Sequence, residues 1–406
     1  MATDEYFPTA FKSAGKEYSA ELAIHFDITY GANFKVLNNN LAKEQYVLTM
    51  CNTEKPTDAT VDATAALQDG FVRKHFTVPL QTYGSDTSGN QGYFNVLGVT
   101  DRQAYISEWV SEPCMQKAHG CSAEMLSVGK SHGCNETLCA IVKPLGEKLQ
   151  QIDSVDGYFR DYGDAESGLD FNPKTIAVHA YLDPHMLYKA EWVKFIAAFF
   201  NKEDVAQKYM DEEEKKWEAS KAEGVAAGDT PLAVIGVTGG WYKKDDGNWA
   251  CCEHQISMPA YFTTCVEAAA GRSYTTADFS SNPHVTLRKC DDWGKDGTEN
   301  CMNPKIAFDA EDPDAVAAFH AALSAADVIF DYTRSSDNLN HKASNFAQDY
   351  GFAEDAAPTN VYRFDGVINS NNGMDWFEGA VLKPAVLLAD MVAALHSTGG
   401  DMLLWH

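Results

Sequence analysis

The chain has 406 residues, with 32 basic and 58 acidic side chains and a formal net charge of −26 at pH 7. A surface this acidic repels nucleic acids and anionic bilayers, because binding to such polyanions depends on clustered Lys and Arg. No apolar run reaches the roughly 20 residues that a membrane-spanning helix needs. The stretch from Ala380 to Leu395 is short and is interrupted by Lys383, Pro384 and Asp390. The length predicts two or three globular domains, and the charge predicts no nucleic-acid partner.

The cysteines and the first residues bear on the compartment. Met1 to Glu5 contain neither a basic nor an apolar segment, so we expect either a cytosolic start or a signal peptide already removed. An even number of cysteines in turn-rich contexts favours disulfides and secretion. The ten cysteines are at positions 51, 114, 121, 134, 139, 251, 252, 265, 290 and 301. Five lie in each half, so either one bridge joins the halves or at least two thiols stay unpaired.

The N-terminal part has the pattern of β-structure. Residues 22–51 alternate in character around two turn-like stretches, Tyr30 to Asn33 and Leu37 to Asn40. This pattern predicts a β-meander that ends near Cys51, within a β-rich extension over residues 1–70.

From Thr77 the pattern changes to short apolar runs separated by helix-like stretches. The expected strands are 77–83, 104–106 and 175–181, and the expected helices include 93–97 and 137–151. Such alternation is typical of α/β structure. We therefore predict an α/β lobe over residues 71–186.

Residues 187–223 contain neither Gly nor Pro, and their large apolar side chains recur at helical spacing. The segment predicts one long helix, or two helices that meet at Asn201. A continuous helix would measure about 55 Å at about 1.5 Å per residue, enough to connect two domains. A surface helix packed on a single core fits the same periodicity.

The α/β pattern resumes after this segment and predicts a second lobe over residues 224–406. Its expected strands are 232–237, 327–331 and 361–364, and its expected helices are 315–326 and 379–396. Open α/β sheets bind ligands outside the carboxyl ends of their strands. Two such ends that faced each other would form a cleft.

Loops that follow the predicted strands carry small polar and aromatic side chains. The loop from Tyr83 to Asn90 is rich in hydroxyl groups, although its glycine spacing matches neither the Walker nor the dinucleotide pattern. Aromatic residues in such loops either cap their own core or contact a large planar ligand. They are Trp109, Trp241, Tyr242, Trp249, Tyr332 and Trp376. The chain has no His-Glu-x-x-His motif, so the sequence supports no zinc protease of that type.

Two His-Gly-Cys steps raise an alternative function. They begin at His119 and His132, 13 residues apart, with Cys114 and Cys139 on either side. Zinc can be held by two His and two Cys, so a Cys/His-rich zinc enzyme such as a carbonic anhydrase is one alternative. A His and a Cys only two residues apart are not a usual chelating pair, and we predict no metal ligands and no catalytic residues.

Three segments resemble the helix-linked periplasmic binding proteins, the class that binds vitamin B12, siderophores and some metals. Residues 95–109 resemble the first helix and second strand of that class, and residues 191–203 resemble the region leading into its second lobe. The run Asp375-Trp376-Phe377-Glu378-Gly379-Ala380, followed by residues 384–390, is similar to the last loop and helix of the bacterial vitamin B12-binding protein. The cysteines, the β-rich extension and an insertion at 114–170 depart from bacterial members and resemble the algal cobalamin acquisition proteins.

The resemblance implies two Rossmann-like lobes joined by a long α-helix over residues 187–223. It also implies that the protein is not an enzyme and that it captures cobalamin between the lobes, outside the cell or at its surface. A signal peptide and any anchor would then be absent from this chain. The expected partners are a corrinoid and a membrane transporter or receptor, for a monomer without a catalytic cofactor.

The residues that we expect to contact the ligand are aromatic or polar, because a corrin ring offers apolar faces and a fringe of amides. They are Tyr83, Ser85, Trp109 and Glu112 in the first lobe and Trp241, Tyr242, Tyr332, Asp375 and Trp376 in the second. The alternative within the class is a ferric siderophore or heme carrier, for which Arg334 and Arg363 are the expected cleft cations.

Overall fold

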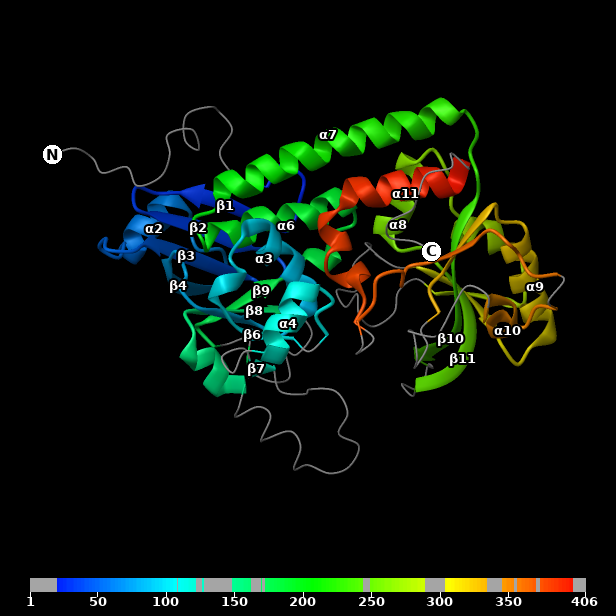
Figure 1. Cartoon of the computed structure of the whole chain (residues 1–406), viewed down its shortest axis with the longest axis horizontal. Coiled ribbons are helices and arrows are strands. Elements are labelled where there is room, and N and C mark those ends of the chain that lie inside the picture. Colours follow the sequence, from blue (N-terminus) through cyan, green and yellow to red (C-terminus); the bar gives the residue numbers. More distant parts are fainter. Residues whose placement is uncertain are drawn as a thin grey trace, which may run out of the picture. The chain divides into compact units, whose positions relative to one another are not determined.

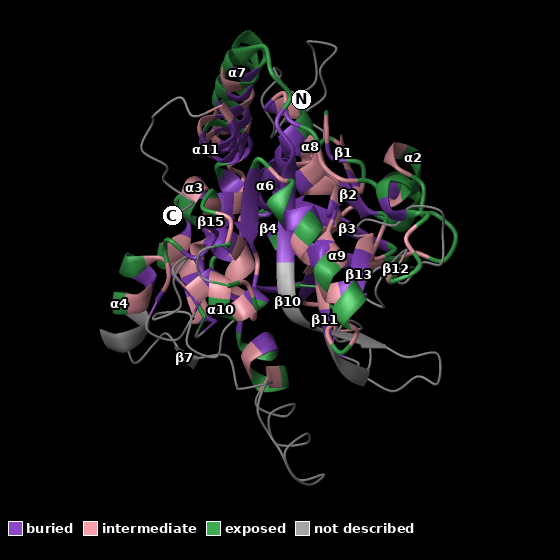
Figure 2. Ribbon diagram, turned by 90° about the vertical axis from the view of Figure 1, so that its right-hand side faces the viewer, coloured by how far each residue is buried: buried purple, intermediate pink, exposed green. Residues whose placement is uncertain are grey.

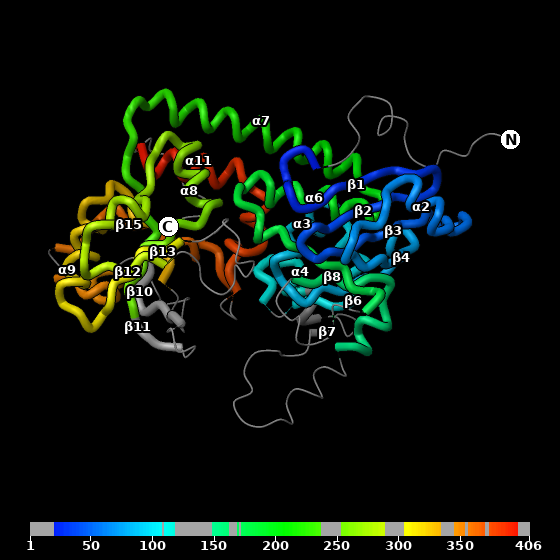
Figure 3. Tube along the Cα trace, turned by 180° about the vertical axis from the view of Figure 1, so that it is seen from behind, coloured from blue at the N-terminus to red at the C-terminus, as the bar shows by residue number. Residues whose placement is uncertain are grey.

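The computed structural model describes residues 20–107, 109–121, 126–127, 148–161, 169, 172–243, 249–288, 304–333, 345–353, 356–369 and 373–396. Within residues 118–121, 126–127 and 237–252 it describes the backbone only. The chain forms two compact units. The first contains Met1–Asp183, Leu187–Glu212 and Gly373–Leu382, and the second contains Pro184–Met186, Glu213–Asn372 and Lys383–His406. Each unit contains a sheet with parallel strands and several helices (Figures 1 and 3), which confirms the predicted α/β class.

The first unit begins with a four-stranded sheet in the order β1-β2-β3-β4. Strands β1 (Phe26–Tyr30), β2 (Phe34–Asn39) and β3 (Glu44–Met50) form the predicted antiparallel meander. Strand β4 (Val72–Val78) pairs in parallel with β3 after helix α2 (Asp58–Thr64). The predicted strand 77–83 is therefore wrong. Its first residues end β4 of this sheet, because Lys74, Phe76 and Val78 alternate inward and bury their side chains.

Both faces of this sheet are covered. Every residue of β2 is buried. One face packs on helix α6 (Met186–Ala198), where the ring of Phe26 lies 5.0 Å from Trp192 and that of Tyr46 lies 5.7 Å from Phe195. Val61 of α2 packs on the other face, against Phe34, Val36 and Val47. Figure 2 shows α6 largely in the colour of buried residues.

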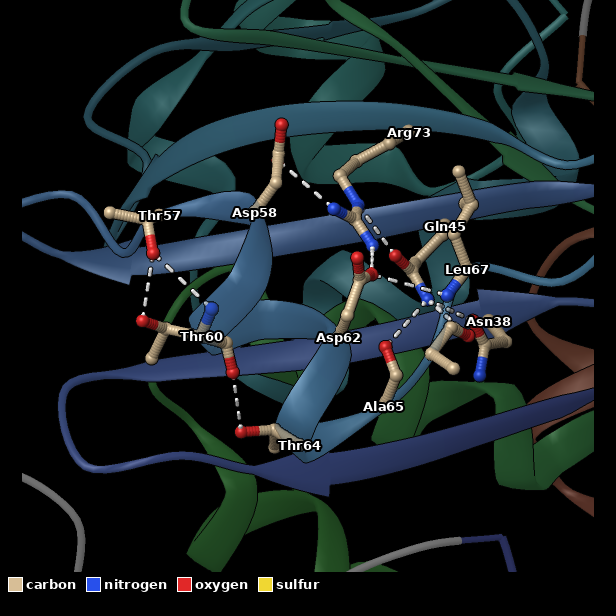
Figure 4. A network of polar contacts seen from close by, with 11 residues as sticks. Asn38, Gln45, Thr57, Asp58, Thr60, Asp62, Thr64, Ala65, Leu67 and Arg73 are labelled. Atoms are coloured by element: carbon tan, nitrogen blue, oxygen red, sulfur yellow. Dashed lines mark hydrogen bonds and ion pairs between the residues drawn. The ribbon is translucent and has the colours of Figure 1, made fainter.

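A polar network attaches α2 to the edge of the sheet (Figure 4). The guanidinium of Arg73 in β4 donates to Gln45 Oε1 at 2.7 Å and to Asp58 Oδ1 at 3.0 Å, and it also pairs with Asp62. Thr57 caps the helix, since its side chain accepts a hydrogen bond from the backbone N–H of Thr60. These contacts supply polar partners for the helix at the solvent-facing edge.

The α/β sheet of the first unit is parallel, in the order β7-β6-β5-β8-β9. Its strands are β5 (Tyr83–Ser85), β6 (Gln103–Ile106), β7 (Leu126–Ser127), β8 (Gly157–Asp161) and β9 (Thr175–Val178). Helix α3 (Gln91–Leu97) follows β5 and ends at Gly98, which takes the left-handed conformation with φ 65°. Helix α4 (Pro113–Cys121) follows β6. The chain extends the sheet from β5 first on the β6 side and then on the β8 side, so the strand order reverses at β5.

Side chains of the N-terminal sheet form hydrogen bonds with backbone groups along the open edge of β9. The amide of Asn39 donates to Ala177 O at 3.0 Å, and Tyr46 Oη accepts from Ala177 N at 2.9 Å. The ammonium of Lys74 donates to Thr175 O at 3.0 Å. Buried backbone groups need such partners, and edge strands are otherwise sites of aggregation. The N-terminal extension therefore completes the polar contacts of the lobe's sheet.

The predicted linking segment is two helices that meet near Asn201. Helix α6 ends at Ala198, and helix α7 (Glu203–Ala227) begins after Asn201, whose φ is 54°. Helix α7 passes from the first unit to the second at Glu212. At about 1.5 Å per residue it is about 37 Å long. Among the described residues, no helix is both long and apolar enough to cross a bilayer.

The second unit has a mixed six-stranded sheet in the order β12-β13-β11-β10-β14-β15. The predicted strands correspond to β10 (Ala233–Lys243), β14 (Val328–Asp331) and β15 (Val361–Arg363), which are parallel. Sequence analysis missed the antiparallel strands β11 (Trp249–Ser257), β12 (Val285–Arg288) and β13 (Lys305–Asp309). The helices are α8 (Ala260–Ala268), α9 (Pro313–Ser324), α10 (Phe346–Tyr350) and α11 (Pro384–His396).

Candidate functional site

The reversal of strand order at β5 marks where the first unit can bind a ligand. In open α/β sheets the crevice lies outside the carboxyl ends of the two strands on either side of such a reversal. In this sheet, the loop after β5 begins at one of these carboxyl ends. Ser85 is 1% exposed, its hydroxyl donates to Thr87 O at 3.0 Å, and it accepts from Asn90 Nδ2 at 3.4 Å. Ser85 therefore shapes its own loop.

Ion pairs hold this loop against β8. The carboxylate of Asp86 lies 3.0 Å from Arg160 Nε of β8 and 2.8 Å from Lys148 Nζ. All three side chains are at most 11% exposed. The loop after β5 is thus fixed by partly desolvated charges, which rigidifies this end of the sheet.

The loop after β6 presents an exposed aromatic ring at the same end of the sheet. Trp109 is 46% exposed, and its backbone N–H donates to Ser107 Oγ at 3.3 Å. Nearly half of this side chain is therefore open to solvent. Ser111 and Glu112 follow directly and lead into α4, where Glu112 Oε2 accepts from Met115 N at 2.6 Å.

The segment Gly373–Leu382 docks on this loop and belongs to the first unit. Asp375 and Trp376 therefore lie in the first unit and not, as expected, in the second lobe. Glu378 is 1% exposed and accepts from Ser111 N at 2.7 Å and from Glu112 N at 3.0 Å. Asp375 Oδ1 accepts from Ser111 Oγ at 3.4 Å and from Gly379 N at 3.1 Å, and Trp376 is 7% exposed. Contacts so distant in sequence leave no local pattern that predicts them.

Burial raises the pKa of Glu378 to about 7, against a usual value of 4.5, and the carboxylate of Asp375 adds to this increase. The hydrogen bonds from Ser111 and Glu112 lower the pKa but do not outweigh burial. Sequence reasoning included Glu378 in the Asp375–Ala380 motif but did not assign it a role. In the sequence, Glu378 is one acidic residue among aromatic and small residues. Such a pattern does not reveal which backbone groups its side chain binds.

Tyr83 lies in the core and lines no ligand surface. It is 0% exposed, its ring is 4.5 Å from that of Phe94 and 5.1 Å from that of Phe200, and its hydroxyl donates to Gln103 Oε1 at 3.4 Å. Burial raises its pKa well above the usual value. We exclude Tyr83 from the site for this reason.

The second unit has an aromatic platform at the carboxyl ends of β14 and β15. Tyr332 follows β14 and is half-buried, and its ring stacks on Phe364 with centroids 4.1 Å apart and planes 21° apart. The stacking holds the Tyr332 ring against Phe364.

Arg363, expected as a cleft cation, is used inside the second unit. It is 0% exposed, pairs with Asp331, donates to Asp365 Oδ2 at 2.6 Å and donates to Thr333 O at 3.1 Å. Tyr350 Oη donates to Asp331 Oδ1 at 2.6 Å within the same network. Arg363 therefore stabilises the strand ends and is not available to an anionic ligand.

Several expected residues lie wholly or partly outside the described part of the chain. Trp241 and Tyr242 lie within strand β10 and not in a loop, but their side chains are outside it. Arg334, both His-Gly-Cys steps and most of the insertion are also outside it. Among the cysteines whose side chains are described, Cys51 and Cys114 are free thiols.

In the described regions, one group of side chains has metal-ligand geometry. Donor atoms of His284, Asp312 and Asp314 lie within 4.8 Å of one another. Asp312 is the N-cap of α9 and accepts from Asp314 N at 2.9 Å, and His284 Nδ1 is 3.1 Å from Asp312 Oδ2. Acidic residues at a helix N-terminus are favoured without any metal. We assign no metal site here.

Comparisons with known proteins give likenesses of shape. The sequence matches no family model, and a search of curated proteins gives no significant match. A periplasmic heme-binding protein from Pseudomonas aeruginosa is 11% identical, with a TM-score of 0.49 over 80% of this chain and 97% of that one. The petrobactin-binding protein of Bacillus subtilis is 11% identical, with a TM-score of 0.47 over 79% and 93%. The periplasmic vitamin B12-binding protein of Vibrio cholerae is 9% identical, with a TM-score of 0.42 over 79% and 99%.

Proposed function

We propose that the protein is a binding protein that captures cobalamin for uptake and catalyses no reaction. The observation that carries the proposal is the joining of Trp109, Ser111, Asp375 and Trp376 at the carboxyl end of the first unit's sheet. A corrin ring has broad apolar faces and an amide fringe. Aromatic rings suit the faces and carboxylates accept from the amides, as in other sites with apolar walls and few polar groups.

The charges of the protein support a ligand with amides over one with carboxylates. The chain carries a net charge of −26, and Arg363 is fully engaged with Asp331 and Asp365. Heme propionates and carboxylate siderophores are anionic, and cationic side chains such as Arg bind such groups strongly. The amides of a corrinoid are neutral and need no cation.

The proposed contacts are Trp109, Glu112, Asp375 and Trp376 from the first unit and Trp241, Tyr242 and Tyr332 from the second, with Ser85 shaping the loop. Tyr332 offers a ring already supported by Phe364. We also propose that the protein acts as a monomer outside the cell or at its surface and passes its ligand to a membrane transporter or receptor.

Calorimetric titration with cyanocobalamin tests the proposal. We expect one molecule bound per chain with micromolar or tighter affinity, and a protein that stays red after gel filtration. Heme and a ferric siderophore serve as competing ligands in parallel titrations. Absence of both heat and retained colour at micromolar protein contradicts cobalamin capture, and binding of either competitor in its place identifies the alternative carrier.

Aromatic substitutions test the placement of the site. We expect Trp376→Ala and Trp241→Ala each to weaken cyanocobalamin binding by about 1–3 kcal/mol, as buried aromatic anchors do at interfaces. Trp109→Ala is expected to act in the same direction, and because Trp109 is 46% exposed its loss does not threaten the core.

The control is Val225→Ala on α7, which removes an apolar side chain that is 64% exposed. It should leave the affinity unchanged. Thermal unfolding of each variant separates lost binding from lost folding. Unchanged affinity in all three tryptophan variants would show that the ligand binds elsewhere.

A further inference from the structure

The Glu378 side chain joins two segments that are far apart in sequence. It lies between the 3-10 turns η8 (Asp375–Phe377) and η9 (Ala380–Leu382). Its two carboxylate oxygens accept separately from Ser111 N at 2.7 Å and Glu112 N at 3.0 Å, across up to 267 residues of sequence. These two N–H groups directly precede α4, so Glu378 also satisfies donors at the start of that helix.

The docked segment packs closely against α3 and the loop before it. A Cβ added to Gly92 in α3 would lie 2.5 Å from Glu378 O, and one added to Gly89 would lie 3.3 Å from Phe377 O. A Cβ on Gly379 would lie 2.4 Å from Asp375 Oδ1. Glycine at these positions allows the segment to approach α3 and allows Asp375 to turn back toward Gly379 and Ser111.

We infer that Glu378 is a positioning residue, whose carboxyl group fastens residues 373–382 to the loop 107–112 and so sets the places of Ser111, Asp375 and Trp376. The statement that these three side chains meet a ligand rests on the proposed function. The fastening itself rests on the two hydrogen bonds and on the close approach at Gly92.

The groups that face Glu378 make this fastening dependent on pH. Its own segment contributes the Asp375 carboxylate, and the facing loop contributes Glu112, whose Oε2 is bound to Met115 N. Helix α3 contributes no charged side chain, and its Tyr93 hydroxyl donates to Lys189 O. Lys383 follows η9 directly. Of these groups, the negatively charged Asp375 carboxylate is the one that adds to the raised pKa of Glu378.

The two pKa values of Glu378 determine whether a rise in pH strengthens or weakens docking of residues 373–382. Its pKa is about 7 when docked, chiefly because it is buried, and 4.5 is the usual value for an undocked side chain. The docked state therefore holds a proton that the undocked state has released between these values, so a rise in pH through this window favours release. The difference corresponds to a change on the order of a hundredfold in the docking equilibrium.

Hydrogen exchange in the ligand-free protein tests the inference. Exchange is measured by mass spectrometry at pH 5.5, 7 and 8.5, corrected for the intrinsic rate, in peptides that cover 107–116 and 373–382. We expect protection of both peptides in the wild type to fall at least tenfold as pH rises, and to fall together. Glu378→Gln should abolish this pH dependence, because the amide does not titrate. The control Glu223→Gln, at an exposed position of α7, should behave as the wild type.

Glu378→Asp retains a titrating carboxylate but is too short to reach both backbone groups. We expect lower protection in this variant, with the pH dependence retained. An unchanged pH profile in Glu378→Gln overturns the inference, and so does a wild-type profile that is flat. The wild-type profile is decisive even if a variant fails to fold.

Cyanocobalamin titration of the same proteins separates the inference from the proposed function. We expect Glu378→Gln to bind about tenfold more weakly than the wild type, since the docked segment carries proposed contacts. Coupled pH-dependent exchange without cobalamin binding would support the positioning role and refute the function. Cobalamin binding with independent exchange in the two peptides would do the reverse.

Discussion

Arg363→Met is expected to destabilise the second unit by about 3–5 kcal/mol, because it leaves two buried carboxylates without their cation. The guanidinium, Asp331 and Asp365 are each at most 1% exposed. Charge burial of this kind is tolerated only with paired partners and well-placed hydrogen bonds, here including Thr333 O. Urea unfolding, followed by hydrogen exchange in peptides of β14 and β15, measures the loss.

A second variant and a control isolate the charge effect. Adding Asp365→Asn to Arg363→Met removes one of the two buried carboxylates left without a cation, and we expect it to recover part of the stability. Lys221→Met breaks an ion pair in which both side chains are about half exposed or more, and should cost at most about 1 kcal/mol. If Arg363→Met costs no more than Lys221→Met, the network does not hold the strand ends.

Local patterns in the sequence predicted the elements that depend on local interactions. Alternation and turns predicted the meander, and the helix expected over 315–326 lies two residues earlier, because Asp312 caps it and Pro313 begins it. The break between α6 and α7 was one of two possibilities, and Asn201 with its φ of 54° is where it occurs. These features depend on the backbone preferences of residues that are close together in the sequence, so a local pattern can reveal them.

Elements whose identity depends on distant partners were not predicted. Strand β5 has only three residues and is held by β6 and β8, whereas the expected strand 77–83 joins the end of β4 to the first residue of β5. Strand β4 reads like a lobe strand but pairs with β3. Sequence alternation specifies a buried face but not the neighbouring strand, which is set by the chain's connections.

The candidate site shows the same limit. The sequence indicated Trp109 and Tyr332 correctly as residues after strands, since a strand end can be recognised locally. It did not show that Tyr83 points into the core, that Arg363 is paired with Asp331, or that residues 373–382 dock in the first unit. Each of these depends on a tertiary contact made across many residues of sequence.

Lys74→Met is expected to destabilise the first unit by about 3–5 kcal/mol, the range for breaking a buried ion pair on one side. Lys74 Nζ lies 2.6 Å from Glu44 Oε1, and their side chains are 3% and 8% exposed. The same ammonium donates to the backbone oxygen and the hydroxyl of Thr175 at 3.0 Å each. The substitution thus removes the cation beside Glu44 and a donor from the edge of β9, and exchange of β9 amides should rise with the loss of stability.

The double variant Lys74→Met with Glu44→Gln tests whether charge is responsible. It leaves no buried carboxylate without a cation, so we expect it to be more stable than Lys74→Met alone. Lys55→Met at an exposed position of the same unit should change stability by at most about 0.5 kcal/mol. A Lys74→Met protein with wild-type stability and unchanged β9 exchange would mean that the N-terminal sheet does not support the lobe's edge through this pair. The extension would then contribute to the lobe through the hydrogen bonds of Asn39 and Tyr46 to Ala177 and through packing on α6.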